Sequence, residues 1–418
     1  MDSFIIEGGS KICGSVKISG SKNSSLPILF STVLTDERCV INNVPELMDI
    51  KTTYELLSYC GKTCFFGFNS FSVDEKNKII TEAPYDLVRK MRASVLIAGP
   101  MLARFKHVKF SMPGGCAIGV RPIDIHLDGF KKFGADVKLD AGYVILSAKK
   151  LKPAVISLKF PSVGATENIM MLASLVEGKS VIKNAAKEPE ISDLACVLNK
   201  MGARVSGAGS NEIVVEGSEK LKGFEHNVIP DRIEAGTFLI LTALCGGRLE
   251  LLNVESRHIE TLLKKLEKTG AILEVYDNRI VISSGKKILP SDIKTEPYPG
   301  YPTDLQAQWT SYMSVADGKS MVVENIFENR FMHVAELIRM GADIEIKHNT
   351  VIINGVKNLK GATVMASDLR AGAGLILAGA RAQGITKVRR VYHIDRGYEK
   401  IELKLLAAGV KIKRIVDE

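Results

Sequence analysis

The apolar and polar positions of this 418-residue chain repeat in one order. A helical segment with apolar residues three and four apart ends at a glycine, and two short strands of alternating apolar and polar residues follow. Residues 259–267 illustrate the helix, and residues 343–347 and 350–353 illustrate the strands. Because glycine readily adopts the left-handed conformation, it suits the end of a helix. The pattern predicts a unit in which a helix is followed by a β-hairpin.

The glycines that end these helices recur at nearly constant intervals, and successive members are 68 to 73 residues apart. They are Gly61, Gly134, Gly202, Gly270, Gly341 and Gly409. A constant period of this length indicates internal repetition of one supersecondary unit. We therefore predict six repeats.

Each repeat also contains a second helix, which is apolar over most of its surface. The six are predicted at residues 25–34, 91–103, 165–176, 233–244, 305–315 and 369–380. Helices that are apolar all round belong inside a core. The sequence therefore predicts an α/β fold in which every repeat contributes one buried helix.

The repeats also predict a division into two lobes, since a chain of this length with 46% hydrophobic residues can bury two cores. Residues 22–230 would form one lobe of three repeats, which carries the loop around Cys116. Residues 1–21 and 231–418 would form the second lobe. We expect the two short crossings between the lobes to act as a hinge that closes a cleft on substrate.

Polar residues stand at or just before the predicted start of each apolar helix. They are Lys22 and Asn23, Arg89 and Lys90, Ser162 to Gly164, Asp231 and Arg232, Asp304, and Asp368. Helix N-termini attract anions, although each of these residues can equally be a cap or a surface charge. If the units pack around a common axis, these ends would converge on one cleft. The net charge of +9 also suits an anionic substrate.

One loop, residues 111–122, has three glycines and two prolines and cannot continue a helix or a central strand. Cys116 stands in its middle, five residues before Arg121. A guanidinium and free backbone N–H groups favour a thiolate. A small cysteine in a surface turn is the alternative. We interpret the loop as a mobile lid that carries a reactive cysteine.

The composition argues against several other classes of protein. Aromatic residues make up 6% of the chain and interleave with no basic run, which disfavours nucleic-acid binding. The first residues are not typical of a signal peptide, and no stretch approaches about 18 apolar residues in a row, so no membrane insertion is expected. Seven scattered cysteines indicate reduced thiols in a cytoplasm. Cys60 and Cys64 lack a second ligand pair, so no metal site is predicted.

Short motifs along the chain carry a family resemblance. They are Gly20–Asn23, Pro113–Gly119, Arg121–Pro122, Pro302–Asp304, Phe327–Phe331 and His393–Tyr398. From Met1 to about Arg414 the chain resembles the UDP-N-acetylglucosamine 1-carboxyvinyltransferases, the enolpyruvyl transferases that open bacterial peptidoglycan precursor synthesis. The resemblance implies the enolpyruvyl transferase fold, a two-lobed inside-out α/β barrel built from six βαβαββ repeats, with helices inside each lobe and sheets outside.

The resemblance also implies an activity. The enolpyruvyl group of phosphoenolpyruvate is transferred to the 3-hydroxyl of UDP-N-acetylglucosamine, phosphate is released, and no metal or organic cofactor is needed. Such a cytoplasmic enzyme serves cell wall biogenesis, and through it cell shape and cell division. The family is a target of fosfomycin, whose phosphonate mimics phosphate while its epoxide meets sulfur.

The chemistry needs an acid at the methylene carbon of phosphoenolpyruvate and a base near the sugar hydroxyl. Cys116 suits the first role, or forms a thioether adduct with the pyruvate moiety, and Asp304 suits the second. By resemblance, the catalytic residues are Cys116, Asp304, Lys22 and Arg396, and the phosphoenolpyruvate-binding residues are Lys22, Asn23, Arg121, Arg330, Arg370 and Arg396. The sugar nucleotide would meet Asn23, Arg92, Arg121, Pro122, Ile123, Asp124, Ile125, Ser162, Val163, Gly164, Asp304 and Ile326. Glu188 and Asp231 match polar family positions but can equally be structural.

The chain departs from part of the family at one position. Some members have a lysine that meets the diphosphate where this chain has Phe160, and the neighbouring Lys159 would point the other way on an extended segment. That contact is therefore in doubt.

Two alternatives remain at this stage. The related shikimate-pathway enolpyruvyl transferase lacks an equivalent reactive cysteine loop. A non-catalytic sugar-nucleotide sensor should have lost one of four residues that this chain keeps, namely Lys22, Cys116, Asp304 and Arg396.

Overall fold

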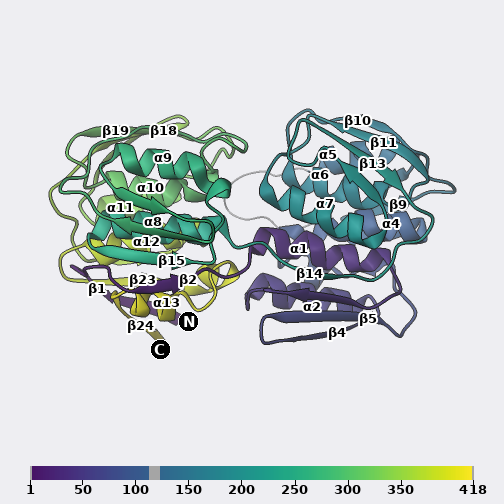
Figure 1. Ribbon diagram of the computed structural model, residues 1–418, viewed down its shortest axis with the longest axis horizontal. Coiled ribbons are helices and arrows are strands. Elements are labelled where there is room, and N and C mark those ends of the chain that lie inside the picture. Colours follow the sequence, from purple (N-terminus) through teal and green to yellow (C-terminus); the bar gives the residue numbers. More distant parts are fainter. Residues whose placement is uncertain (1, 113–122, 417–418) are drawn as a thin grey trace. The chain divides into compact units, whose positions relative to one another are not determined.

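The structure is a computed structural model that describes residues 2–112 and 123–416 (Figure 1). The chain forms two compact units. Within the described residues, the central unit comprises residues 20–112 and 123–229, and the terminal unit comprises residues 2–19 and 230–416.

The central unit alternates helices with short strands. In chain order these are α1 (Lys22–Ser31), β3 (Cys39–Asn42), α2 (Met48–Tyr59), β4 (Lys62–Gly67), β5 (Ser70–Glu75), β6 (Glu82–Ala83), α3 (Tyr85–Val88), α4 (Ala98–Phe105), β7 (His107–Ser111), α5 (Asp124–Lys132), β8 (Asp136–Asp140), β9 (Tyr143–Ser147), β10 (Val155–Ser157), α6 (Val163–Ala173), β11 (Gly178–Lys183), α7 (Pro189–Met201), β12 (Arg204–Ser206), β13 (Glu212–Gly217) and β14 (Glu225–Asn227). Two 3₁₀ turns, η1 (Thr32–Leu34) and η2 (Arg92–Ile97), adjoin α1 and α4.

The terminal unit follows the same plan. Its elements are β1 (Asp2–Glu7), β2 (Ser15–Lys17), α8 (Arg232–Cys245), β15 (Arg248–Leu252), α9 (Glu260–Lys268), β16 (Ile272–Val275), β17 (Arg279–Ser283), β18 (Ile293–Lys294), α10 (Gln306–Met313), β19 (Lys319–Val323), α11 (Met332–Arg339), β20 (Asp343–Lys347), β21 (Thr350–Asn354), β22 (Thr363–Met365), α12 (Leu369–Arg381), β23 (Ile385–Arg389), α13 (Ile401–Ala407) and β24 (Lys411–Val416). Its 3₁₀ turns are η3 (Ser256–Ile259), η4 (Thr303–Leu305) and η5 (Val391–Arg396).

Six four-stranded sheets, three in each unit, share one topology. Their orders are β14-β3-β5-β4, β6-β7-β9-β8 and β10-β11-β13-β12 in the central unit, and β2-β15-β17-β16, β18-β19-β21-β20 and β22-β23-β1-β24 in the terminal unit. In each sheet the first pair of strands is parallel and the other two pairs are antiparallel. A parallel pair needs a crossover, and in the four sheets that begin with β6, β10, β18 and β22 the apolar helix of the repeat lies within it. This is the βαβαββ repeat.

Three of the sheets are completed by strands from distant parts of the sequence. Residues of β2 pair with β15 although more than 200 residues separate them, and β14 pairs with β3 across a similar span. The N-terminal β1 lies between β23 and β24 and completes the last repeat. The spacing of the stop glycines therefore predicts the repeats but not which strand closes each sheet.

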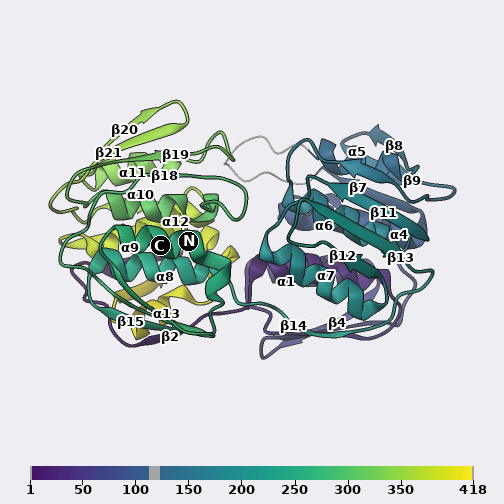
Figure 2. The ribbon, with the colours of Figure 1, turned by 45° about the horizontal axis from the view of Figure 1, so that its top comes forward.

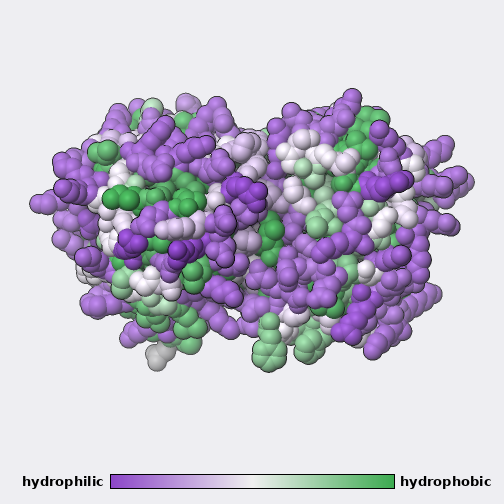
Figure 3. Space-filling view, in the orientation of Figure 1, coloured by the Kyte–Doolittle hydropathy of each residue, from purple (hydrophilic) through white to green (hydrophobic). Residues whose placement is uncertain are grey.

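The apolar helices form the core of each unit, as predicted. In the terminal unit α8, α10 and α12 pack against one another, and in the central unit α1 and α4 each contact α6 (Figure 2). Every residue of α8 from Ile233 to Leu244 is buried, and so is every residue of α10. The sheets lie outside these helices, and polar side chains cover most of the face seen in Figure 3.

The prediction of one continuous helix at residues 91–103 is wrong, because the structure has two segments there, η2 and α4. The side chain of Asn168 on α6 lies between them: its Nδ2 donates to Val95 O (2.9 Å), and its Oδ1 accepts from Gly99 N (2.7 Å). In a continuous α-helix these two backbone groups would bond to each other. The inserted amide therefore divides the 3₁₀ turn η2 from α4.

Candidate active site

Asp304 accepts hydrogen bonds from two arginines of the terminal unit. Arg330 NH2 lies 2.8 Å from Asp304 Oδ1, and Arg370 NH2 lies 2.9 Å from Oδ2. Asp304 stands in η4, Arg330 directly precedes Phe331 and α11, and Arg370 is in the first turn of α12. Three helix starts, far apart in sequence, therefore bring these side chains together.

The arginines of this cluster are buried, and their charge exceeds that of the carboxylate between them. The exposed fraction is 6% for Arg330 and 3% for Arg370, whereas the Asp304 side chain is 24% exposed. Burial acts to lower the pKa of Arg370, but Asp304 and Tyr398 outweigh it, and the pKa is raised. Arg370 NH1 has no hydrogen-bond partner within the described part of the chain. A buried guanidinium with an unused N–H group is suited to binding an anion.

Neutral polar side chains contact Asp304 and Arg370 on the side that faces the helical core. Gln308 Nε2 donates to Asp304 O (3.1 Å) and also lies 3.1 Å from the hydroxyl of Tyr398. The Arg370 guanidinium lies 5.4 Å from the centre of the Tyr398 ring. Burial raises the pKa of Tyr398, so its hydroxyl keeps its proton, and it lies 2.9 Å from the hydroxyl of Thr237. These side chains fix the backbone of Asp304 and the plane of Arg370.

Three further predicted residues lie at helix termini. Arg396 ends η5 in the terminal unit and is half-buried. Lys22 begins α1 in the central unit, where Ser21 caps the helix by accepting from Ser24 N, and Lys22 Nζ lies 3.6 Å from Asp49 Oδ2. Asn23 follows in the same turn and is half-buried.

The central unit brings three helix starts together around His126. Arg92 begins η2, Asp124 and Ile125 begin α5, and Ser162 caps α6 through a bond from Ala165 N (3.4 Å). The His126 ring faces Gly164, where an added Cβ would lie 3.4 Å from Cε1. Of the remaining residues expected to meet the sugar nucleotide here, Ile123 is buried and Val163 is half-buried.

The other polar residues expected near helix starts lie at helix caps or on the surface. Asp231 caps α8 by accepting from Ile233 N (2.8 Å) and Glu234 N (2.9 Å), which favours the structural interpretation. Glu188 directly precedes α7. Arg89 forms an exposed ion pair with Asp86, and Lys90 forms one with Glu55. Both residues precede the apolar segment, which begins at Arg92.

The departure at Phe160 leaves an exposed pair of side chains. Lys159 is 82% exposed at its side chain and lies 4.0 Å from Asp128 Oδ2, while Phe160 is 42% exposed. The expected residues Cys116, Arg121 and Pro122 lie outside the described residues.

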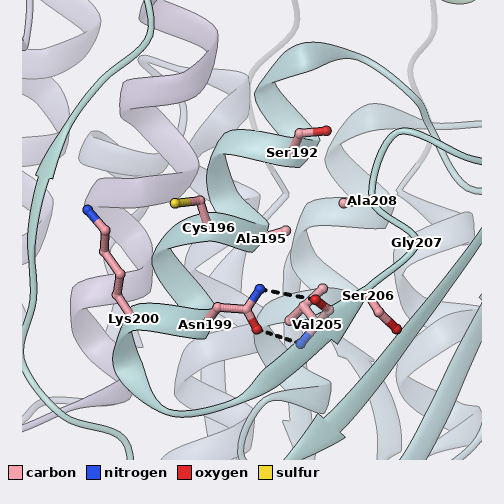
Figure 4. A pocket seen from close by; sticks show the side chains of 9 residues that line it. All are labelled: Ser192, Ala195, Cys196, Asn199, Lys200, Val205, Ser206, Gly207 and Ala208. Atoms are coloured by element: carbon pink, nitrogen blue, oxygen red, sulfur yellow. Dashed lines mark hydrogen bonds between the residues drawn. The ribbon is translucent and has the colours of Figure 1, made fainter.

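A pocket on the central unit contains none of the predicted site residues (Figure 4). It is lined by Ser192, Ala195, Cys196, Asn199, Lys200, Val205, Ser206, Gly207 and Ala208. The Asn199 amide is engaged by Val205, donating to its O (3.0 Å) and accepting from its N (2.7 Å).

Among the described residues, no three His, Cys, Asp or Glu side chains are grouped so that they could hold a metal ion. In the same ranges, none of the helices has the length and apolar character needed to cross a membrane.

A pH prediction follows from His126, which is buried, with its Nδ1 3.1 Å from Asn168 Nδ2. Burial and then the charge of Arg92 lower its pKa from 6.5 to about 3. The imidazole should therefore stay neutral in the folded protein from about pH 8 to about pH 5. As pH falls below 6.5, only the unfolded chain gains this proton, so folding stability is lost towards acid. NMR of histidine-labelled protein, assigned with His126→Gln, measures this, and a midpoint near the ordinary value would contradict it.

Comparisons with known proteins agree with the geometry. The family model described as EPSP synthase (3-phosphoshikimate 1-carboxyvinyltransferase) matches residues 6–405. Proteins named UDP-N-acetylglucosamine 1-carboxyvinyltransferase are 53% identical in Endomicrobium trichonymphae, covering 99% of this chain and 100% of the relative, and 50% identical in Geobacter metallireducens, with the same coverage.

Solved structures share the fold. The enolpyruvyl transferase NikO from Streptomyces tendae has a TM-score of 0.90 at 22% identity, covering 99% of this chain and 98% of that one. EPSP synthase from Acinetobacter baumannii has a TM-score of 0.79 at 16% identity, with full coverage of both chains. The predicted enolpyruvyl transferase fold is thereby confirmed, and the chain belongs to the UDP-N-acetylglucosamine 1-carboxyvinyltransferase family.

Proposed function

We propose that this protein transfers the enolpyruvyl group of phosphoenolpyruvate to the 3-hydroxyl of UDP-N-acetylglucosamine and releases phosphate. The family membership supports the activity, and the observation that carries the site is the Asp304 carboxylate held between buried Arg330 and Arg370. The reaction is the first committed step towards peptidoglycan precursors, and we place it in the cytoplasm.

Phosphoenolpyruvate carries a phosphate and a carboxylate, so its site needs several cations. Arg330 and Arg370 supply two buried guanidiniums, of which Arg370 retains an NH1 group without a partner in the described residues. Lys22, Asn23, Arg121 and Arg396 complete the proposed set. The buried arginines are strong candidates because a guanidinium away from water binds an anion with little competition from solvent.

Asp304 is proposed to accept the proton of the sugar hydroxyl. Each of its oxygens accepts one arginine N–H, and a carboxylate oxygen has a second acceptor site. Its side chain is 24% exposed, so a substrate hydroxyl can reach it. The arginines hold the carboxylate in one orientation, which is what a general base requires.

The proposed reaction proceeds by addition and elimination. The 3-hydroxyl oxygen bonds to C2 of phosphoenolpyruvate and gives its proton to Asp304, while Cys116 protonates the C3 methylene. The Cys116 thiolate then takes a proton from C3 as phosphate leaves C2, which restores the double bond in the product, and the proton on Asp304 passes to solvent. A thioether between Cys116 and C2 is the alternative covalent role, and it forms the pyruvate adduct.

The sugar nucleotide is proposed to bind the helix starts of the central unit, with Asn23, Arg92, Ile123, Asp124, Ile125 and Ser162 to Gly164, together with Arg121, Pro122, Asp304 and Ile326. The ion pair of Lys159 with Asp128 supports the view that Lys159 does not replace the missing diphosphate lysine.

The direct test is phosphate release from phosphoenolpyruvate with and without UDP-N-acetylglucosamine. We expect release only with the sugar nucleotide. Release that depends instead on shikimate 3-phosphate would favour the shikimate-pathway alternative, and binding of the sugar nucleotide without release would favour a sensor.

Replacing Asp304 tests the base. We expect Asp304→Ala to lower kcat on the order of 10²–10⁴-fold, the usual cost of losing a general base. UDP-N-acetylglucosamine binding, measured by calorimetry, should weaken far less. Turnover near that of the wild type would assign the base elsewhere.

Cys116 is tested by its reactivity. We expect fosfomycin to form one stoichiometric adduct, on Cys116, faster when UDP-N-acetylglucosamine is bound. Cys116→Asp should block alkylation yet retain turnover, because a carboxyl can still deliver a proton, whereas Cys116→Ala should lose most activity. Peptide mass mapping would show the site. Adducts on exposed Cys13 or Cys196 with Cys116 intact would end this assignment.

A further inference from the structure

Glu324 is a buried carboxylate that no sequence motif of the site includes. It directly follows β19 and is 3% exposed. A buried carboxylate is costly unless hydrogen bonds compensate for the lost water. Both of its oxygens are engaged, and they serve different parts of the terminal unit.

The first oxygen, Oε1, closes the turn that carries Ile326. It accepts from Ile326 N (2.8 Å), from Phe327 N (3.1 Å) and from the hydroxyl of Thr295 (2.9 Å). Thr295 in turn accepts from Asn325 N (2.9 Å). Three donors converge on one carboxylate oxygen. The backbone of this turn is therefore held by hydrogen bonds to a side chain and not by the backbone hydrogen bonds of a sheet.

The second oxygen, Oε2, sets the direction of a relay to Arg330. It accepts the hydroxyl of Thr303 (2.8 Å), which uses the single proton of that hydroxyl. The lone pairs of Thr303 Oγ1 are then available, and Arg330 NH1 donates to them (2.8 Å). The other NH2 group of the same guanidinium binds Asp304. Because an ionised carboxylate can only accept, every bond in this relay has one allowed direction.

We propose that Glu324 is a positioning residue for the reaction, which orients Arg330 and Asp304 through Thr303 and holds the turn of Ile326 through its other oxygen. This inference rests on the proposed function. Glu324 touches no substrate in this account and acts only through its neighbours.

An amide at this position separates the two roles. In Glu324→Gln the carbonyl oxygen can still accept the three donors of the turn. The amide NH2 then faces Thr303 Oγ1 as a donor, so the hydroxyl proton loses its acceptor and can turn towards the lone pair that Arg330 NH1 uses. The substitution therefore disturbs Arg330 and Asp304 and leaves the turn in place.

The experiment compares Glu324→Gln with the wild type by phosphate release and by calorimetric binding of UDP-N-acetylglucosamine. We expect kcat to fall by up to about 100-fold, because small displacements of positioned groups are costly in rate. The dissociation constant of the sugar nucleotide should stay within about threefold. Thr303→Val cuts the same relay, so the double variant should lose little more than either single one.

A matched control removes a carboxylate charge elsewhere. Glu75 ends β5 in the central unit and accepts from Arg104 NH2 (2.8 Å) and Lys62 Nζ (2.8 Å). Glu75→Gln should lower the melting temperature without changing kcat. In both variants the fall in kcat is compared with the fall in melting temperature. If kcat falls in the same proportion in Glu75→Gln as in Glu324→Gln, the loss at Glu324 is one of stability and the inference is overturned.

The remaining outcomes also decide the matter. Glu324→Gln with wild-type kcat, or multiplied losses in the double variant, would overturn the positioning role while the proposed function stands. An inactive wild type would overturn the proposed function and this inference together. Should Glu324→Gln fail to fold, Thr303→Val alone gives the test, with the same split between kcat and nucleotide binding.

Discussion

The bridge between Asp304 and two buried arginines is the interaction on which the candidate site depends. Arg330 and Arg370 are cations that burial would penalise if they stood alone, and Asp304 pairs with both. The two buried guanidiniums suit an anionic substrate, and the shared carboxylate is held where a base is needed. Anion binding and proton transfer are therefore two consequences of one charge arrangement.

The fold explains how such a cluster can be assembled. Each repeat buries one apolar helix, and polar residues at the starts of these helices are carried with it. Asp304 and Arg370 belong to the starts of neighbouring buried helices, and Gln308 lies one turn further into the core. A core of helices within sheets allows charged groups to sit at helix ends while the helix bodies remain apolar.

Much of this could be predicted from the sequence because it depends on local pattern. The stop glycines have φ values from 87° to 108°, as their helix-ending role requires, and the apolar segments are the core helices. What the sequence did not reveal depends on long-range contacts. Asn168 divides a predicted helix by inserting from α6, and Glu324 is an ordinary glutamate until the fold brings Thr303 and Thr295 to it. The pairing of β2 with β15 and of β14 with β3 likewise has no local signal.

The central claim is that these residues transfer an enolpyruvyl group to a particular hydroxyl, and identification of the product tests it most directly. Phosphoenolpyruvate labelled with carbon-13 at C2 would be incubated with the protein and UDP-N-acetylglucosamine, and the product examined by NMR. The account predicts that the label becomes a vinyl ether carbon coupled to the proton at C3 of the sugar, in amounts equal to the phosphate released. Label recovered as free pyruvate, or attached to another sugar position, would contradict it.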